Sequence, residues 1–85
     1  MPRPPVIPKK EVAIAVLSHI ACNPGQLTGR VEYELSDYLR QYQVRETMHW
    51  LLENDYVERR KADGSSGKQW HAKVTVREFL EERDR

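Results

Sequence analysis

The sequence predicts a small α+β domain with a three-helix core, a C-terminal β-hairpin and a short terminal helix. The main observation is a change of hydrophobic period between residues 44 and 76. Residues 44–55 place apolar side chains at helical spacing, whereas residues 69–76 alternate apolar and polar side chains, as a half-buried strand does. The second observation is length, because 85 residues can bury only one small core. We therefore expect a single folded unit.

Composition narrows the class of protein. The net charge is only +1 at pH 7, whereas dedicated DNA-binding domains are often strongly basic. No apolar run approaches the length of a membrane span, and the first ten residues lack the features of a signal peptide. Cys22 is the only cysteine, which excludes an internal disulfide and fits a reducing compartment. We expect a soluble, cytoplasmic protein without a cofactor and without a membrane partner.

The charges are unevenly distributed along the chain. Residues 1–10 contain Arg3, Lys9 and Lys10 and no acid. Residues 57–73 are also rich in cations, whereas residues 11–39 are acidic. This asymmetry favours an anionic partner at the basic end of the molecule.

The first elements are an arm and a buried helix. Residues 1–8 contain four prolines and should form an extended arm, either disordered or docked on the domain. Residues 9–23 are apolar around most of a helical circumference and should form the central helix, which ends before Pro24. His19 and Cys22 are spaced as two metal ligands on one helix face. No second pair accompanies them, which favours a structural role for both.

The next segment should contain a second helix and a turn. Residues 26–30 are a connector that can add a short third strand to the hairpin. Residues 31–40 have the spacing of an amphipathic helix, with Val31, Leu35, Tyr38 and Leu39 inside. The outer face would be acidic and would carry Glu32, Glu34 and Asp37. Glu34 and Asp37 could pair as catalytic carboxylates, but a solvated face is the better interpretation. Residues 40–43 are the expected turn.

A third helix, a hairpin and a terminal helix complete the fold. Residues 44–55 form the third helix, and residues 57–62 and 69–76 are strands around a glycine-serine turn at 63–67. Trp70 should face inward as a lid on the core. Thr75 and Glu78 have the form of a capping box that starts a helix at about residues 76–83. Phe79 and Leu80 could pack on the core or against a second copy of the chain.

The order of helix, strand, loop and strand resembles the winged helix-turn-helix family. The residues that carry the resemblance run from Leu52 to Arg60, with the sequence LENDYVERR, where the recognition helix passes into a two-stranded wing. The turn at 40–43 is shorter than is usual in that family and has no glycine. The resemblance covers roughly residues 9–76. With the elements on either side of it, we expect an arm at 1–8, a winged-helix domain at 9–76 and a short charged helix at 77–85.

The resemblance also implies sequence-specific binding of double-stranded DNA, as in a small transcriptional regulator. The helix at 44–55 would lie in the major groove and the wing at 57–75 on the backbone. Arg45, Glu46 and His49 would read bases, since arginine pairs with guanine and glutamate accepts from cytosine. The residues expected on the phosphate backbone are Arg40, Gln41, Gln43, Arg59, Arg60, Lys61, Lys68 and Lys73. A homodimer through the terminal helix would match a palindromic site.

Other interpretations remain open on the sequence alone. The charged hairpin could protect an edge strand from aggregation, and the third helix could be an ordinary solvated one. Winged helices also bind proteins, in which case exposed Tyr33, Tyr42 and Trp50 would be the anchors. An enzyme is not expected, because the sequence has no phosphate-binding glycine loop, no activated nucleophile and no metal-ligand constellation.

Overall fold

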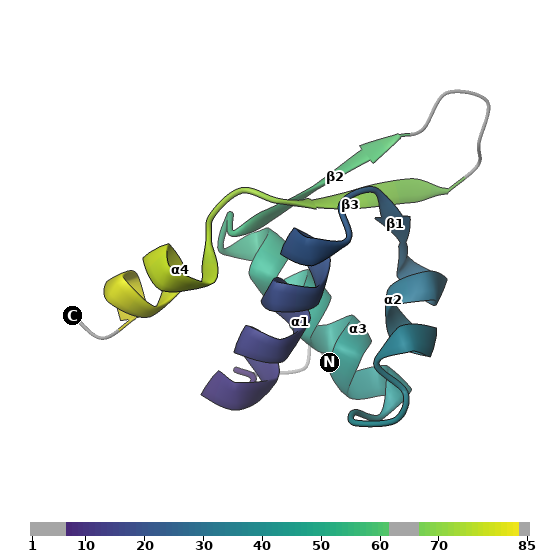
Figure 1. The fold of residues 1–85 in the computed structure, drawn as a ribbon, viewed down its shortest axis with the longest axis horizontal. Helices are drawn as coiled ribbons and strands as arrows, with labels where there is room; N and C mark the ends of the chain where they lie inside the picture. Colours follow the sequence, from purple (N-terminus) through teal and green to yellow (C-terminus); the bar gives the residue numbers. More distant parts are fainter. Residues whose placement is uncertain (1–6, 62–66, 84–85) are drawn as a thin grey trace, which may run out of the picture.

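The β-sheet lies across one end of three packed helices, and a fourth helix packs beside them (Figure 1). The computed structural model describes residues 7–61 and 67–83. These ranges contain four helices and a three-stranded antiparallel sheet, which confirms the predicted α+β class. The elements in chain order are α1 (Lys10–Cys22), β1 (Gln26–Leu27), α2 (Thr28–Glu34), α3 (Gln41–Glu53), β2 (Val57–Lys61), β3 (Lys68–Ala72) and α4 (Val76–Arg83).

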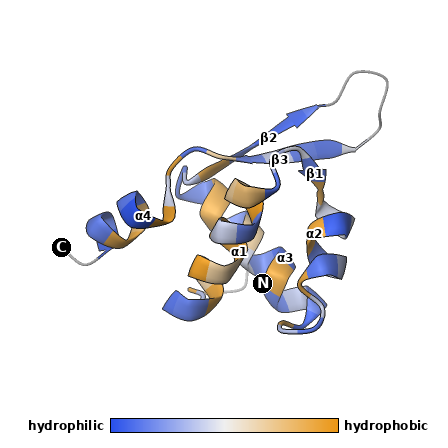
Figure 2. Ribbon diagram, viewed as in Figure 1, coloured by the Kyte–Doolittle hydropathy of each residue, from blue (hydrophilic) through white to orange (hydrophobic). Residues whose placement is uncertain are grey.

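Helix α1 is the centre of the core, as its apolar composition predicts. Its inward residues Ala13, Val16, Leu17 and Ile20 are all buried. Apolar residues accordingly colour much of α1 in Figure 2, while β2 is mainly hydrophilic. The helix ends at Asn23, whose backbone N–H and side-chain amide both donate to the carbonyl oxygen of His19 at 3.0 Å. The predicted helix at 9–23 is therefore confirmed to within one residue at each end.

The sheet has the strand order β1-β3-β2. The third strand expected within 26–30 is present as β1, although it is only two residues long and pairs with Trp70 and Gln69 of β3. Gly25 makes the approach to β1 at φ 87°, a conformation that glycine adopts without the strain other residues would meet. All three strands lie on one side of α1, α2 and α3 (Figure 1). The helices therefore cover one face of the sheet.

The second helix and the turn after it differ from the prediction. Helix α2 spans Thr28–Glu34 rather than 31–40, and the turn occupies 35–40 rather than 40–43. The α-helical pattern ends at Ser36, whose N–H and hydroxyl both donate to the Tyr33 carbonyl, at 3.2 and 2.6 Å. Tyr38, expected inside, is 82% exposed as a result. Helix α3 then starts at Gln41, where the Gln43 side chain accepts a hydrogen bond from the Arg40 N–H at 3.1 Å.

The passage from α3 to β2 is a tight helix C-terminus. The Tyr56 N–H donates to the Leu51 carbonyl at 2.9 Å, and the Asp55 N–H donates to the Leu52 carbonyl at 3.1 Å. These two bonds define a Schellman motif. Asp55 occupies its left-handed position at φ 65°, which aspartate tolerates better than most residues. The motif fixes the direction in which the hairpin leaves α3.

Helix α4 folds back on the core. Its Phe79 is 2% exposed and lies edge-on to Trp50 and Tyr56, with ring centroids 6.4 and 5.0 Å away. The predicted capping box is confirmed, since the Glu78 N–H donates to the Thr75 hydroxyl and the Thr75 N–H donates to the Glu78 carboxylate. Trp50, expected as an exposed anchor, is buried because α4 covers it. Of the two alternatives for Phe79, packing on its own core is the one observed.

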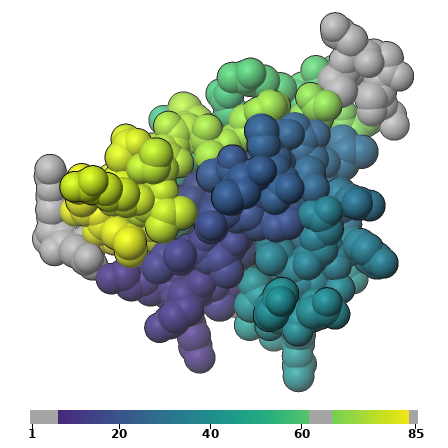
Figure 3. Space-filling view, in the orientation of Figure 1, coloured from purple at the N-terminus to yellow at the C-terminus, as the bar shows by residue number. Residues whose placement is uncertain are grey.

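The molecule is elongated along the hairpin. Its longest dimension is 41 Å, and α4 lies at the end opposite to the far ends of β2 and β3 (Figures 1 and 3). Among the residues that the structure describes, no helix has both the length and the apolar character that a membrane crossing requires. Most of the predicted arm at 1–8 and most of the turn at 63–67 lie outside the described residues.

Candidate nucleic-acid interface

One face of the hairpin carries cations and, among its described residues, no acid. Side chains alternate between the two faces of a strand, so paired residues of β2 and β3 share a face. The face toward the helices contains the pairs Val57–Ala72, Arg59–Trp70 and Lys61–Lys68. Val57 and Trp70 are buried, whereas Arg59, Lys61 and Lys68 are exposed. We call these three exposed residues the cationic face.

The opposite face of the hairpin is different in charge. It contains the pairs Glu58–His71 and Arg60–Gln69. Glu58 and Arg60 form an ion pair with each other along the strand. Arg60, although predicted with the other wing cations, therefore lies apart from the cationic face, and its charge is balanced locally.

Trp70 connects the cationic face to α3. Its ring is 1% exposed, and its indole N–H donates to the Thr28 hydroxyl of α2 at 2.7 Å. The guanidinium of Arg59 lies over this ring, 5.4 Å from the centroid, within cation–π range. The imidazole of His49 in α3 contacts the same ring edge-on, with 6.2 Å between the two ring centroids. Arg59 of the hairpin and His49 of α3 thus both contact the Trp70 ring, where the hairpin meets α3.

The exposed side of α3 continues this surface. Arg45 and His49 are exposed and lie one helical turn apart, as the sequence predicts. Glu46, the third predicted base-reading residue, is half-buried and lines a cavity toward the N-terminal segment. The structure therefore brings Arg45, His49 and the cationic face together and places Glu46 at the side of α3.

Arg45 is held by an acid that was expected to face solvent. Glu32 of α2 is 4% exposed and points toward α3. Its carboxylate accepts hydrogen bonds from Arg45 Nε at 3.0 Å, from Arg45 Nη2 at 3.3 Å and from Gln41 Nε2 at 2.6 Å. The prediction of a solvated Glu32 is wrong because α2 starts three residues earlier than expected and packs this residue against α3.

The other residues predicted to contact the DNA phosphate backbone lie outside the cationic face. Arg40 is exposed in the turn before α3, and Gln43 is half-buried as the cap of that helix. Lys73 follows β3 and donates to the Asp55 carboxylate at 2.6 Å, a hydrogen bond that raises the pKa of Lys73. It lies at the end of the hairpin nearest α3 and α4, away from Lys61 and Lys68. Gln41 is bound to Glu32.

A polar cluster joins α1, β1 and α2. His19 Nε2 lies 2.8 Å from Gln26 Oε1 and 3.0 Å from Glu34 Oε2. The hydrogen bond that Glu34 accepts from Gln26 lowers the pKa of its carboxyl, and Arg30 and His19 act in the same direction, while burial opposes them. Among the described residues, no three His, Cys, Asp or Glu side chains gather as a metal site would require. His19 is held in this cluster by Gln26 and Glu34.

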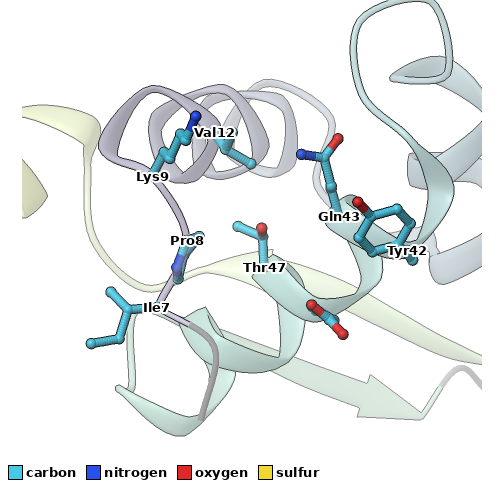
Figure 4. Close-up of a pocket in the computed structure, with 8 residues that line it drawn as sticks. Ile7, Pro8, Lys9, Val12, Tyr42, Gln43 and Thr47 are labelled. Carbon is cyan, nitrogen blue, oxygen red and sulfur yellow. The ribbon is translucent and has the colours of Figure 1, made fainter. Parts of the chain in front are cut away.

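A cavity of about 270 Å³ lies between the N-terminal segment and the start of α3 (Figure 4). Ile7 and Pro8 form one side of it, Val12 of α1 another, and Tyr42 and Thr47 of α3 a third. Nothing in the spacing of these residues identifies the cavity from sequence, because it depends on how the N-terminal segment crosses α3.

Comparison with known proteins adds no assignment: no protein-family model matches the chain, and no curated protein is significantly similar to it.

Proposed function

We propose that this chain is a winged-helix protein that binds double-stranded DNA in a sequence-specific manner, as a small transcriptional regulator. Helix α3 would lie in the major groove, and the β2–β3 hairpin would be the wing on the adjacent phosphate backbone. The element order α1-β1-α2-α3-β2-β3 supports the fold, with β1 in the place where winged helices often add a third strand. The hairpin leaves α3 directly, through one tight turn.

The cationic face carries the proposal. Lys61 and Lys68 lie directly opposite each other on paired strands, and Arg59 follows on the same face. Like charges at paired positions repel each other and destabilise a hairpin. A bound polyanion removes that cost, because phosphate oxygens between the strands would neutralise both ammonium groups. The same face adjoins His49 through Trp70, so backbone and base contacts would be continuous.

Salt dependence tests this proposal. Each cation that neutralises a phosphate contributes about −0.9 to the slope of log Kobs against log salt concentration. Arg59→Ala, Lys61→Ala and Lys68→Ala should each flatten that slope by about 0.9 on a random-sequence duplex. The matched control is Arg60→Ala, on the opposite face of β2, which should change the slope much less. Fluorescence anisotropy at a series of salt concentrations measures all four.

Backbone NMR of the labelled protein locates the surface independently. Addition of a random-sequence duplex at low salt should shift the amides of residues 45–49 and of the cationic face, and leave α4 unchanged. Absence of any shift and of any anisotropy change at low salt would reject DNA binding.

A protein-interaction module is the second candidate. The observation in its favour is a set of exposed aromatic side chains around α2 and the start of α3, where Tyr33, Tyr38 and Tyr42 are 73, 82 and 57% exposed. Such side chains are enriched among interface hot spots. Protein binding would become the favoured function if the duplex caused no NMR shift and no anisotropy change.

A further inference from the structure

We infer that Glu32 is a positioning residue that orients Arg45 to recognise a guanine in the target sequence. The inference rests on the proposed DNA binding and adds to it the base that is read. The inference depends on the contact between Glu32 of α2 and Arg45 of α3, which is already formed in this structure.

Glu32 is unusual among the acids in the described part of the chain because it is buried. Its side chain is 5% exposed, whereas that of Arg45 is 57% exposed. A buried carboxylate is stable only when its oxygens are satisfied by donors. Three hydrogen bonds from Arg45 and Gln41 satisfy it, and both donors come from the exposed side of α3. The hydrogen bonds that stabilise the buried Glu32 carboxylate therefore also hold the Arg45 side chain in position.

The contact uses one particular edge of the guanidinium. Glu32 accepts from Nε and Nη2, which form the side edge of the planar group. The fixed geometry of arginine leaves a second edge, made of the outer N–H groups of the two terminal nitrogens. Guanine presents O6 and N7 in the major groove as a matching pair of acceptors. A side chain held on Glu32 by one edge can thus donate to guanine with the other.

Charge separates this role from phosphate binding. The Glu32 carboxylate balances the Arg45 guanidinium, so the pair adds little to the attraction between α3 and the phosphate backbone. The cationic face lies elsewhere, on the hairpin. Glu32 and Arg45 should therefore affect base preference strongly and general affinity weakly. Holding Arg45 in advance also reduces the conformational freedom that it would lose on binding.

The experiment compares dissociation constants for two duplexes. Selection from a randomised pool first defines the preferred site of the wild-type chain, and guanine is then replaced by adenine at each preferred position. We expect one position at which guanine is favoured about 10-fold or more. Glu32→Gln should reduce that ratio, because the amide NH₂ that replaces one oxygen cannot accept and the remaining oxygen cannot satisfy Arg45 Nε, Arg45 Nη2 and Gln41 together. Random-duplex affinity should not fall, because loss of the carboxylate leaves the Arg45 charge unbalanced and available to the phosphate backbone.

Two further variants make the result specific. Arg45→Lys keeps the charge and can still pair with Glu32, but one ammonium group cannot hold Glu32 by one edge and guanine by another, so the preference should weaken. Glu34→Gln is the matched control, since Glu34 lies on the same helix and binds Arg30 and Gln26 rather than α3. It should leave the ratio unchanged.

The outcomes are distinguishable. If Glu32→Gln lowered affinity equally for every duplex, or if Arg45→Lys kept the guanine preference, the positioning role would be rejected while DNA binding stood. Arg45→Lys is on the surface, so it decides the matter even if Glu32→Gln does not fold. A wild-type chain that bound no duplex would instead reject the proposed function and the inference with it.

Discussion

Replacement of Trp70 by phenylalanine should destabilise the whole fold, because this one ring joins the sheet to two helices. The indole is 1% exposed, donates to Thr28 of α2 at 2.7 Å and meets His49 of α3 edge-on. Phenylalanine keeps an aromatic ring at the position. It removes the hydrogen bond and part of the buried volume, and leaves the strand pairing intact.

The expected loss follows from those two changes. The smaller ring gives up buried apolar atoms that contribute about 2 kcal/mol, and a cavity remains where they were. The lost hydrogen bond costs about 1 kcal/mol more. A total of about 3 kcal/mol corresponds to a fall in Tm of about 12–24 °C for a domain of this size. Thr28→Val, which leaves the ring in place but its N–H unsatisfied, should cost about 1–3 kcal/mol.

Thermal unfolding followed by circular dichroism measures both losses. Tyr38→Phe is a suitable control, because Tyr38 is 82% exposed and should unfold within about 1 °C of the wild type. A Trp70→Phe protein that melted within a few degrees of the wild type would refute the central role of this ring. A Thr28→Val protein with unchanged stability would show that the hydrogen bond to α2 contributes nothing.

Two further predictions concern stability. The pKa of Glu34 is lowered, chiefly by the hydrogen bond from Gln26, so its contribution to stability is present above the unfolded value of about 4.5 and is lost as pH falls through the lower folded value. Glu34→Gln should therefore flatten the acid side of the curve of unfolding free energy against pH, measured by urea titration. Equal curves for the variant and the wild type would contradict this prediction. Phe79→Ala should lower the free energy of unfolding by about 3–5 kcal/mol, since the ring is buried against Trp50 and Tyr56. Arg77→Ala, on the exposed side of α4, is its control. Equal urea midpoints for these two variants would mean that α4 is not part of the core.

Much of the fold can be predicted from local patterns. The apolar circumference of α1, the alternation around Trp70 and the capping box at Thr75 each depend on neighbours within a few residues. The helix and the capping box are confirmed, whereas the strand predicted at 69–76 ends at Ala72 and Val76 begins α4. Local spacing also correctly places Arg45 and His49 on the exposed side of α3. These signals are strong because each depends on the geometry of a single helix or strand.

The errors arise where two elements meet. Apolar spacing at Val31 and Leu35 fits a helix at 28–34 as well as one at 31–40, so the pattern does not fix where α2 begins. Glu32 lies about 60° from Leu35 around a helix, at the border of the buried stripe, and only the partner across the interface decides its burial. That partner, Arg45, is distant in sequence. Trp50 is similar, because α4 has to pack before it is covered.

Net charge is a weak guide to the partner of this chain, because acids and cations occupy different places. A charge of +1 suggests no affinity for a polyanion. Yet Glu32 is buried against α3, Glu34 is bound between α1 and α2, and Glu58 lies on the outer side of β2 beside Arg60. None of these three acids lies on the cationic face. Because salt screens charges beyond about 8 Å, the field that a phosphate meets there depends on the local cations and much less on the sum over the chain. An 85-residue protein with balanced composition can therefore present one cationic face, as the proposed DNA binding requires, since strand alternation sorts its charges onto opposite sides of the hairpin.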